Sequence, residues 1–254
     1  MMVDSAKEPK QPSRGIYLLP NLFTTGALFS GFYAITTAMN GRFETAAIAI
    51  FVAMILDGMD GRVARMTNTQ SAFGVEYDSL SDMISFGAAP ALVMYLWAFP
   101  TLGKLGLFAA FVHTAGGALR LARFNTQVEI LDKRYFQGLA SPAAAGTLVS
   151  TVWFFADQGI SGESVRWLML VETVLLGLLM FSRVRYFSGK SWPIGDRIPI
   201  GFMFLLVLIF VLLAIDPPTV LMVIGILYVT SGVIVTLLGR RQWKSRRRKA
   251  GADD

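Results

Sequence analysis

The stretch that decides the fold of this chain reads Asp57-Gly-Met-Asp60-Gly61-Arg-Val-Ala-Arg65, followed by eight residues, Gly74, Asp78 and Asp82. It lies where two strongly apolar segments meet. Residues three and four apart share one face of an α-helix, so each half of the stretch predicts one acidic stripe. Two neighbouring helices in a hairpin would bring the two stripes together.

The four carboxylates of this stretch predict a metal centre. Four like charges at close quarters cannot all stay ionised without a counter-charge, so either some protons are retained or divalent cations lie among them. The ligands are all oxygen, without His or Cys, and such a set favours hard ions such as Mg²⁺ or Mn²⁺. Two ions bridged by shared carboxylates would suit an in-line attack at phosphorus.

Composition indicates an integral membrane protein. Of the 254 residues 54% are hydrophobic and only 16% are charged. There is no cysteine, which excludes disulfides, thiolate nucleophiles and zinc-thiolate sites. The formal net charge is +6, and the basic residues lie mostly between and after apolar segments. This distribution favours a membrane surface and membrane lipids over nucleic acid as partner.

The apolar runs predict an all-α protein with about eight transmembrane helices, each of about 20 mostly apolar residues. The expected helices span residues 16–39, 43–65, 75–98, 104–124, 140–157, 164–182, 199–215 and 218–239. Residues 1–15 are expected to form a polar cytoplasmic tail and residues 240–254 a basic one. The membrane domain, 16–239, divides into a core, 16–185, and two additional helices, 199–239.

The distribution of Lys and Arg predicts the orientation. If both termini are cytoplasmic, 20 of the 23 basic residues fall on the inner side. The positive-inside rule therefore favours an even number of spans, with the aspartates facing the cytoplasm. The basic run Arg240 to Lys249 would attract anionic lipid, or it only fixes the topology.

The pattern D-x-x-D-G-x-x-A-R-x8-G-x3-D-x3-D resembles the signature of the CDP-alcohol phosphatidyltransferases, and every fixed position is met. The resemblance implies a helical bundle of that family, in which an alcohol hydroxyl displaces CMP from a CDP-linked lipid with the help of Mg²⁺ or Mn²⁺. It also implies a homodimer. As a separate expectation, the protein lies in a bacterial inner membrane.

The same resemblance assigns roles to the motif. Asp57, Asp60 and Asp78 are metal ligands, and Asp82 lies near the second metal and acts as the base that deprotonates the attacking hydroxyl. The CDP-lipid would be held by Gly61, Arg65 and Gly74. The glycines offer close backbone approach to the nucleotide or, alternatively, tight helix packing.

Four further stretches resemble the phosphatidylserine synthase branch of the family, although Ala140 stands where a second proline is common. They begin at Pro20, Asp82, Leu119 and Phe136, and they read PNLFT, DMISFGAAP, LRLARFN and FQGLASP. The implied donor is CDP-diacylglycerol and the implied acceptor is L-serine.

Several polar residues in these stretches are candidates for substrate contacts, each with a plainer alternative. Arg120 and Arg123 could bind the serine carboxylate as a fork or only anchor the helix end. Asn21 and Thr24 would contact the phosphate of the CDP-lipid. Ser85 and Ser141 would line the serine pocket. For all four residues the alternative is a role in helix packing.

Two other functions fit the sequence less well. Within the family the acceptor could be glycerol 3-phosphate or inositol, but a phosphorylated acceptor requires more cationic contacts than serine. A divalent-cation transporter would also carry carboxylates inside a membrane domain. Transporter sites lie near the bilayer midplane on interrupted helices, whereas these aspartates are expected at the cytoplasmic edge.

Overall fold

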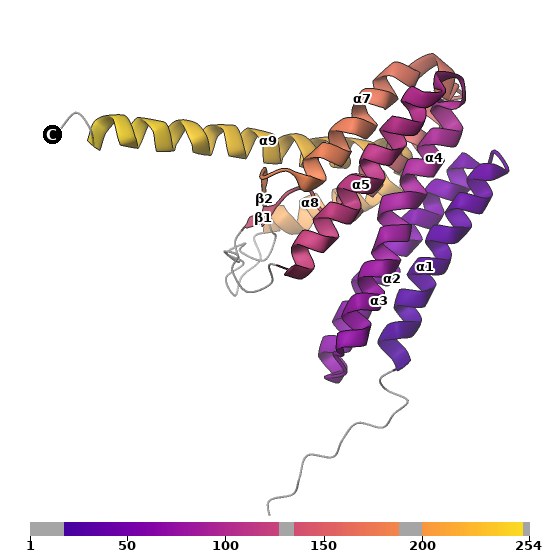
Figure 1. The fold of residues 1–254 in the computed structure, drawn as a ribbon, viewed down its shortest axis with the longest axis horizontal. Coiled ribbons are helices and arrows are strands. Elements are labelled where there is room, and N and C mark those ends of the chain that lie inside the picture. Colours follow the sequence, from indigo (N-terminus) through magenta and orange to yellow (C-terminus); the bar gives the residue numbers. More distant parts are fainter. Residues whose placement is uncertain (1–17, 127–134, 188–199, 251–254) are drawn as a thin grey trace, which may run out of the picture.

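The computed structural model describes residues 18–126, 135–187 and 200–250, and these form a helical bundle with one short ribbon (Figure 1). The expected N-terminal tail lies outside the described residues. The helices are α1 (Leu18–Met39), α2 (Phe43–Thr67), α3 (Ala72–Asp82), η1 (Met83–Ala88), α4 (Ala89–Ala98), η2 (Pro100–Leu102), α5 (Lys104–Thr126), α6 (Ser141–Asp157), α7 (Gly162–Phe181), α8 (Ile200–Ile215) and α9 (Pro217–Ala250). The strands are β1 (Tyr135–Gln137) and β2 (Arg185–Phe187).

A short turn joins the two acidic helices. α2 ends at Thr67, and the next residue, Asn68, has a φ of 52°, the left-handed conformation common after a helix. Three residues later Ser71 caps α3, and its Oγ accepts a hydrogen bond from the amide of Gly74 at 3.0 Å. Both helices pack against α1, which thus aligns the two acidic stripes.

The expected third helix, 75–98, is present but is not uniform. Between α3 and α4 the chain winds into the π-helix η1, directly after Asp82. Neighbouring helices hold this segment: Ser85 Oγ donates to the carbonyl of Ala27 in α1 at 3.1 Å, and Thr114 Oγ1 of α5 donates to that of Gly87 at 3.4 Å. A π-turn inside an α-helix often accompanies a functional site.

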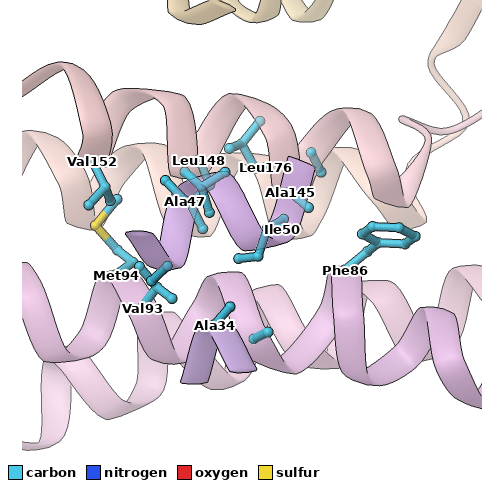
Figure 2. Packing of buried hydrophobic residues seen from close by; sticks show 14 of the residues in the cluster. Ala34, Ala47, Ile50, Phe86, Val93, Met94, Ala145, Leu148, Val152 and Leu176 are labelled. Atoms are coloured by element: carbon cyan, nitrogen blue, oxygen red, sulfur yellow. The ribbon is translucent and has the colours of Figure 1, made fainter. Parts of the chain in front are cut away.

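The core is built from small and aliphatic side chains where α2, α4, α6 and α7 meet. Ile50, Val93, Met94 and Leu148 are fully buried there (Figure 2). Membrane helices pack closely where side chains are small, and the many core alanines provide such contacts.

The α5–α7 contact is a close approach of two helices. A Cβ on Gly116 would lie 2.2 Å from the carbonyl oxygen of Gly177, so the two backbones touch.

The C-terminal part departs from the expected fold in two respects. First, β1 and β2 pair antiparallel and add a ribbon of three residues a strand to the expected helical bundle, which is otherwise confirmed. Second, the basic segment expected as a tail continues α9 as helix as far as Ala250. In Figure 1, α9 extends beyond the other helices toward the C-terminus.

The number of spans is confirmed only in part. In the described residues five helices are long and apolar enough to cross a membrane: those of 19–39, 72–98, 104–126, 162–181 and 217–237. α8 is a shorter apolar helix, α6 has only 17 residues, and α2 carries the charged motif. The chain is therefore a multi-pass membrane protein, and the total of eight transmembrane helices remains a prediction.

Candidate active site

Three of the four aspartates meet at one point between α2 and α3. Asp57 and Asp60 come from α2 and Asp78 from α3, and one oxygen of each lies within 4.8 Å of the others. The convergence predicted from helical spacing is thus present. Three carboxylates at this separation, with oxygen as the donor atom, fit a hard divalent cation.

Asp82 lies beside this cluster, one helical turn beyond Asp78. Its carboxyl group is within hydrogen-bonding reach of Asp57, and the positive charge of Arg120 in α5 also acts on it. Asp82 is the last residue of α3 before the π-helix. It therefore lies at the edge of the acidic cluster, outside the group formed by the other three aspartates.

Thr24 of α1 orients the buried carboxyl group of Asp60. Its Oγ1 donates to Asp60 Oδ2 at 2.7 Å, and its own carbonyl accepts from Ser81 Oγ of α3 at 3.1 Å. One residue of α1 therefore contacts both acidic helices. Outer groups that hold ligand carboxylates in this way are expected to tune metal affinity.

A cleft of about 400 Å³ opens beside the cluster. Its lining includes Asp60, Asp78 and all five residues that the sequence suggested for the CDP-lipid: Asn21, Thr24, Gly61, Arg65 and Gly74. These residues come from three helices, and the structure brings them together at one place.

The two glycines differ in their surroundings. A Cβ on Gly61 would lie 3.5 Å from Nη1 of Arg65, so this side chain folds back over Gly61. A Cβ on Gly74 would come within 3.1 Å of Ser71 Oγ and 3.6 Å of Asn21 Oδ1. Gly74 thus leaves room where the turn, α1 and the cleft meet.

Three turn residues that line the cleft were not predicted from the sequence: Thr69, Gln70 and Ser71. Ser71 had a recognisable signal, because a serine directly before a helix can cap it. Its hydroxyl then accepts a hydrogen bond from an amide of the first turn, which here is that of Gly74. Thr69 is buried, and its hydroxyl pairs with that of Thr67 at 2.7 Å. Nothing in the sequence predicted that pair.

Two of the serine-pocket candidates contact each other. Arg120 Nη1 donates to Ser141 Oγ at 3.0 Å and so connects α5 to the start of α6. The Nε of Arg120 is buried and has no hydrogen-bond partner among the described residues. This guanidinium can therefore offer a further hydrogen bond, and it lies next to Asp82.

The other two candidates are bonded elsewhere. Arg123 donates to the carbonyls of Phe181 and Ser182 at the end of α7, at 3.5 and 3.4 Å, and to the side chain of Gln137. Ser85 is fully buried in η1 and donates to α1. These contacts agree with the alternative of helix anchoring and packing.

Comparison with known proteins places this site in a family. The profile of the CDP-alcohol phosphatidyltransferases matches residues 17–179. The chain is 39% identical to a CDP-diacylglycerol–serine O-phosphatidyltransferase of Helicobacter pylori over 226 residues, which are 88% of this chain and 92% of that protein. It is 32% identical to the protein of the same name from Bacillus subtilis, over 66% of this chain and 89% of that protein.

Among solved structures, the chain resembles the Mycobacterium tuberculosis phosphatidylinositol phosphate synthase with CDP-DAG bound. The identity is 20% and the TM-score 0.48, over 73% of this chain and 92% of that chain. The family profile covers the whole acidic cluster and the cleft beside it. The chain therefore belongs to the CDP-alcohol phosphatidyltransferase family.

Proposed function

We propose that this protein is a phosphatidylserine synthase. It transfers the phosphatidyl group of CDP-diacylglycerol to the hydroxyl of L-serine and releases CMP. The observation that carries the proposal is the 39% identity to a CDP-diacylglycerol–serine O-phosphatidyltransferase over 88% of the chain. That similarity extends well beyond the motif common to the family, and so it bears on the acceptor as well as on the donor.

The aspartates would hold the metal, which we propose to be Mg²⁺ or Mn²⁺ in two sites. Asp57, Asp60 and Asp78 are close enough to share one ion, and Asp82 would contribute to a second. Bound cations of this kind neutralise diphosphate oxygens and stabilise the leaving CMP. The protein's own part is to hold four carboxyl groups in one place, with Thr24 fixing Asp60.

The cleft beside the cluster would take the CDP part of the donor. Arg65 can pair with the diphosphate by charge-assisted hydrogen bonds. Gly61 and Gly74 add no side chain to the lining, so the nucleotide could approach the backbone closely there. Asn21 offers a side-chain amide. The α3 helix begins at this cleft, so its N-terminal partial positive charge also favours a bound anion.

Asp82 would accept the proton of the serine hydroxyl as this oxygen attacks the phosphorus. Its place at the edge of the cluster supports this role, because a base must reach the acceptor while its neighbours hold the ions. Arg120, bonded to Ser141, would bind the carboxylate of serine. The acceptor would then lie between a cation and the base.

We also propose the orientation and assembly of the protein. Both termini and the active site would face the cytoplasm, since 20 of 23 basic residues then lie on that side. Residues 16–185 would form the catalytic core, with 199–239 added to it and polar segments at 1–15 and 240–254. By resemblance to the family we expect a homodimer, and we also propose a bacterial inner membrane as its location.

The test is an acceptor assay with purified protein. CMP release from CDP-diacylglycerol is measured in Mn²⁺ or Mg²⁺ with L-serine, glycerol 3-phosphate or inositol, and each labelled lipid product is identified. We expect turnover with serine only. Turnover with another acceptor and none with serine would contradict the proposal, and metal flux in proteoliposomes without lipid turnover would favour a transporter.

A further inference from the structure

Two arginines of α5, three positions apart on one face of the helix, hold the two ends of a short segment, 137–141. Arg120 Nη1 donates to Ser141 Oγ at 3.0 Å, and Arg123 Nη2 donates to the side-chain oxygen of Gln137. The segment joins β1 to the start of α6. Its position therefore decides where the hydroxyl that holds Arg120 lies.

The end of α7 holds the middle of the same segment. The amide of Gly138 donates to the carbonyl of Val184 at 2.8 Å, and that of Leu139 donates to the carbonyl of Leu179 at 3.0 Å. Gly138 has a φ of 83°, and a Cβ there would collide with the carbonyl oxygen of Met180. Leu139 is fully buried. The backbone of the segment is thus tied to the end of α7 by two hydrogen bonds and a close contact.

Arg123 connects three parts of the chain at this place. Besides Gln137 of β1, its guanidinium reaches the carbonyls of Phe181 and Ser182, at 3.5 and 3.4 Å. These two residues lie at the C-terminal end of α7, where carbonyl groups lack partners within the helix and a cation is favoured. The side chain therefore ties the end of α5 to β1 and to the end of α7.

The two arginines differ in what they offer to a ligand. Both terminal nitrogens of Arg123 donate within the protein, Nη1 to the two carbonyls and Nη2 to Gln137. Arg120 donates to Ser141, and its Nε is buried without a hydrogen-bond partner among the described residues. A guanidinium binds a carboxylate as a fork only with donors that are not already engaged. Arg120 therefore suits the acceptor itself, whereas Arg123 suits the wall of its site.

Resting on the proposed function, we infer that Arg123 is a positioning residue that acts through Gln137. It fixes the segment 137–141 against the end of α7, so that Ser141 holds Arg120 in the orientation that binds the serine carboxylate. Loss of the link lets Ser141 shift and weakens acceptor binding. The donor cleft is unaffected, because its lining comes from α1, α2, α3 and the turn before α3.

The experiment is a double-mutant cycle in the full-length protein with Arg123→Met, Gln137→Leu and the double variant. KM and kcat are measured for L-serine, and KM for CDP-diacylglycerol. Each single variant should raise the KM for serine about fivefold, as for the loss of a hydrogen bond to a charged group, with kcat and the KM for CDP-diacylglycerol unchanged. The double variant should match the single ones, because all three remove the same link. Gln137→Glu can still accept from Arg123 and should behave as wild type.

Arg166→Met is the matched control. Arg166 Nη1 donates to Thr101 Oγ1 at 3.2 Å near the opposite end of α7, so its loss removes a similar bond far from the segment. It should leave every constant as in wild type, and thermal unfolding should show that the variants are folded. Should Arg123→Met not fold, the comparison of Gln137→Leu with Gln137→Glu decides alone.

Two results would overturn the assignment of Arg123. One is an unchanged KM for serine in Gln137→Leu. The other is a multiplied loss in the double variant, which would show that Arg123 contacts the acceptor directly. A wild type that does not use serine would instead contradict the proposed function itself.

Discussion

Acidic side chains lie within the helical bundle in two regions, and the two settings differ. At the junction of α2 and α3, three aspartates place one oxygen each within 4.8 Å of the others, with Asp82 beside them. In α7, by contrast, Glu172 accepts one hydrogen bond from Thr151 Oγ1 of α6 at 2.9 Å. It lines a cleft of about 890 Å³ whose other walls, from α6, α7 and α9, are almost wholly apolar.

The difference shows what makes a carboxyl group in a membrane protein a candidate site. A single buried carboxyl group can keep its proton, so it needs no cation. Several acidic groups that share one point repel each other and need a counter-charge there. Clustering, and not acidity alone, therefore separates the proposed active site from Glu172.

The largest effect is expected from Asp82→Asn. The amide cannot accept the proton of the serine hydroxyl, so turnover should fall about a thousandfold. Binding of CDP-diacylglycerol should remain in part, because the cleft that would hold it is lined by other residues. CMP release and lipid binding are measured in parallel, and activity at the wild-type level would remove Asp82 from the role of base.

A smaller loss of turnover is expected from Asp57→Asn, together with weaker metal binding. Asp57 is one of the three clustered carboxyl groups, so its loss removes a ligand. The apparent affinity for Mn²⁺ should fall by about a hundredfold, and high Mn²⁺ should restore part of the activity. Mn²⁺ titration followed by electron paramagnetic resonance measures this, and an unaltered titration curve would argue against Asp57 as a ligand.

Thr24→Val tests the support of the cluster from α1. The change keeps the shape of the side chain and removes the 2.7 Å hydrogen bond to Asp60. We expect about a tenfold weaker Mn²⁺ affinity, which is the usual scale for a residue that orients a metal ligand. Thr24→Ser keeps the hydroxyl and should behave as wild type, so an equal loss in both variants would point to packing instead.

The smallest effect is expected from Glu172→Gln, which tests the other side of the comparison. Glutamine keeps the size of the side chain and can still accept from Thr151, so turnover and Mn²⁺ affinity should stay within about twofold of wild type. Both are measured with the same assays. A loss as large as that of Asp57→Asn would show that Glu172 belongs to the reaction and that clustering is the wrong criterion.

The sequence predicted the acidic site well because local spacing decided it. The positions of Asp57, Asp60 and Asp78 on their helices follow from the 3.6-residue period, and the short turn between α2 and α3 brings them together. The helix bounds predicted from the apolar runs also agree with those of the structure, to within a few residues at most helix ends.

What the sequence did not predict depends on contacts between distant segments. The π-helix after Asp82 is held by Ala27 of α1 and Thr114 of α5, which no local pattern reveals. The ribbon pairs Tyr135–Gln137 with Arg185–Phe187 across almost 50 residues. The close contact of Gly225 with Thr147 joins segments almost 80 residues apart, so only the folded chain could show it.

The central claim is that carboxyl groups from two neighbouring helices gather cations at the place where the lipid donor is split. The most direct test is anomalous scattering from crystals grown with Mn²⁺ and CDP-diacylglycerol. The account predicts manganese peaks among Asp57, Asp60, Asp78 and Asp82, with the diphosphate of the donor touching them. Peaks only elsewhere, or a donor diphosphate bound away from these four residues, would contradict it.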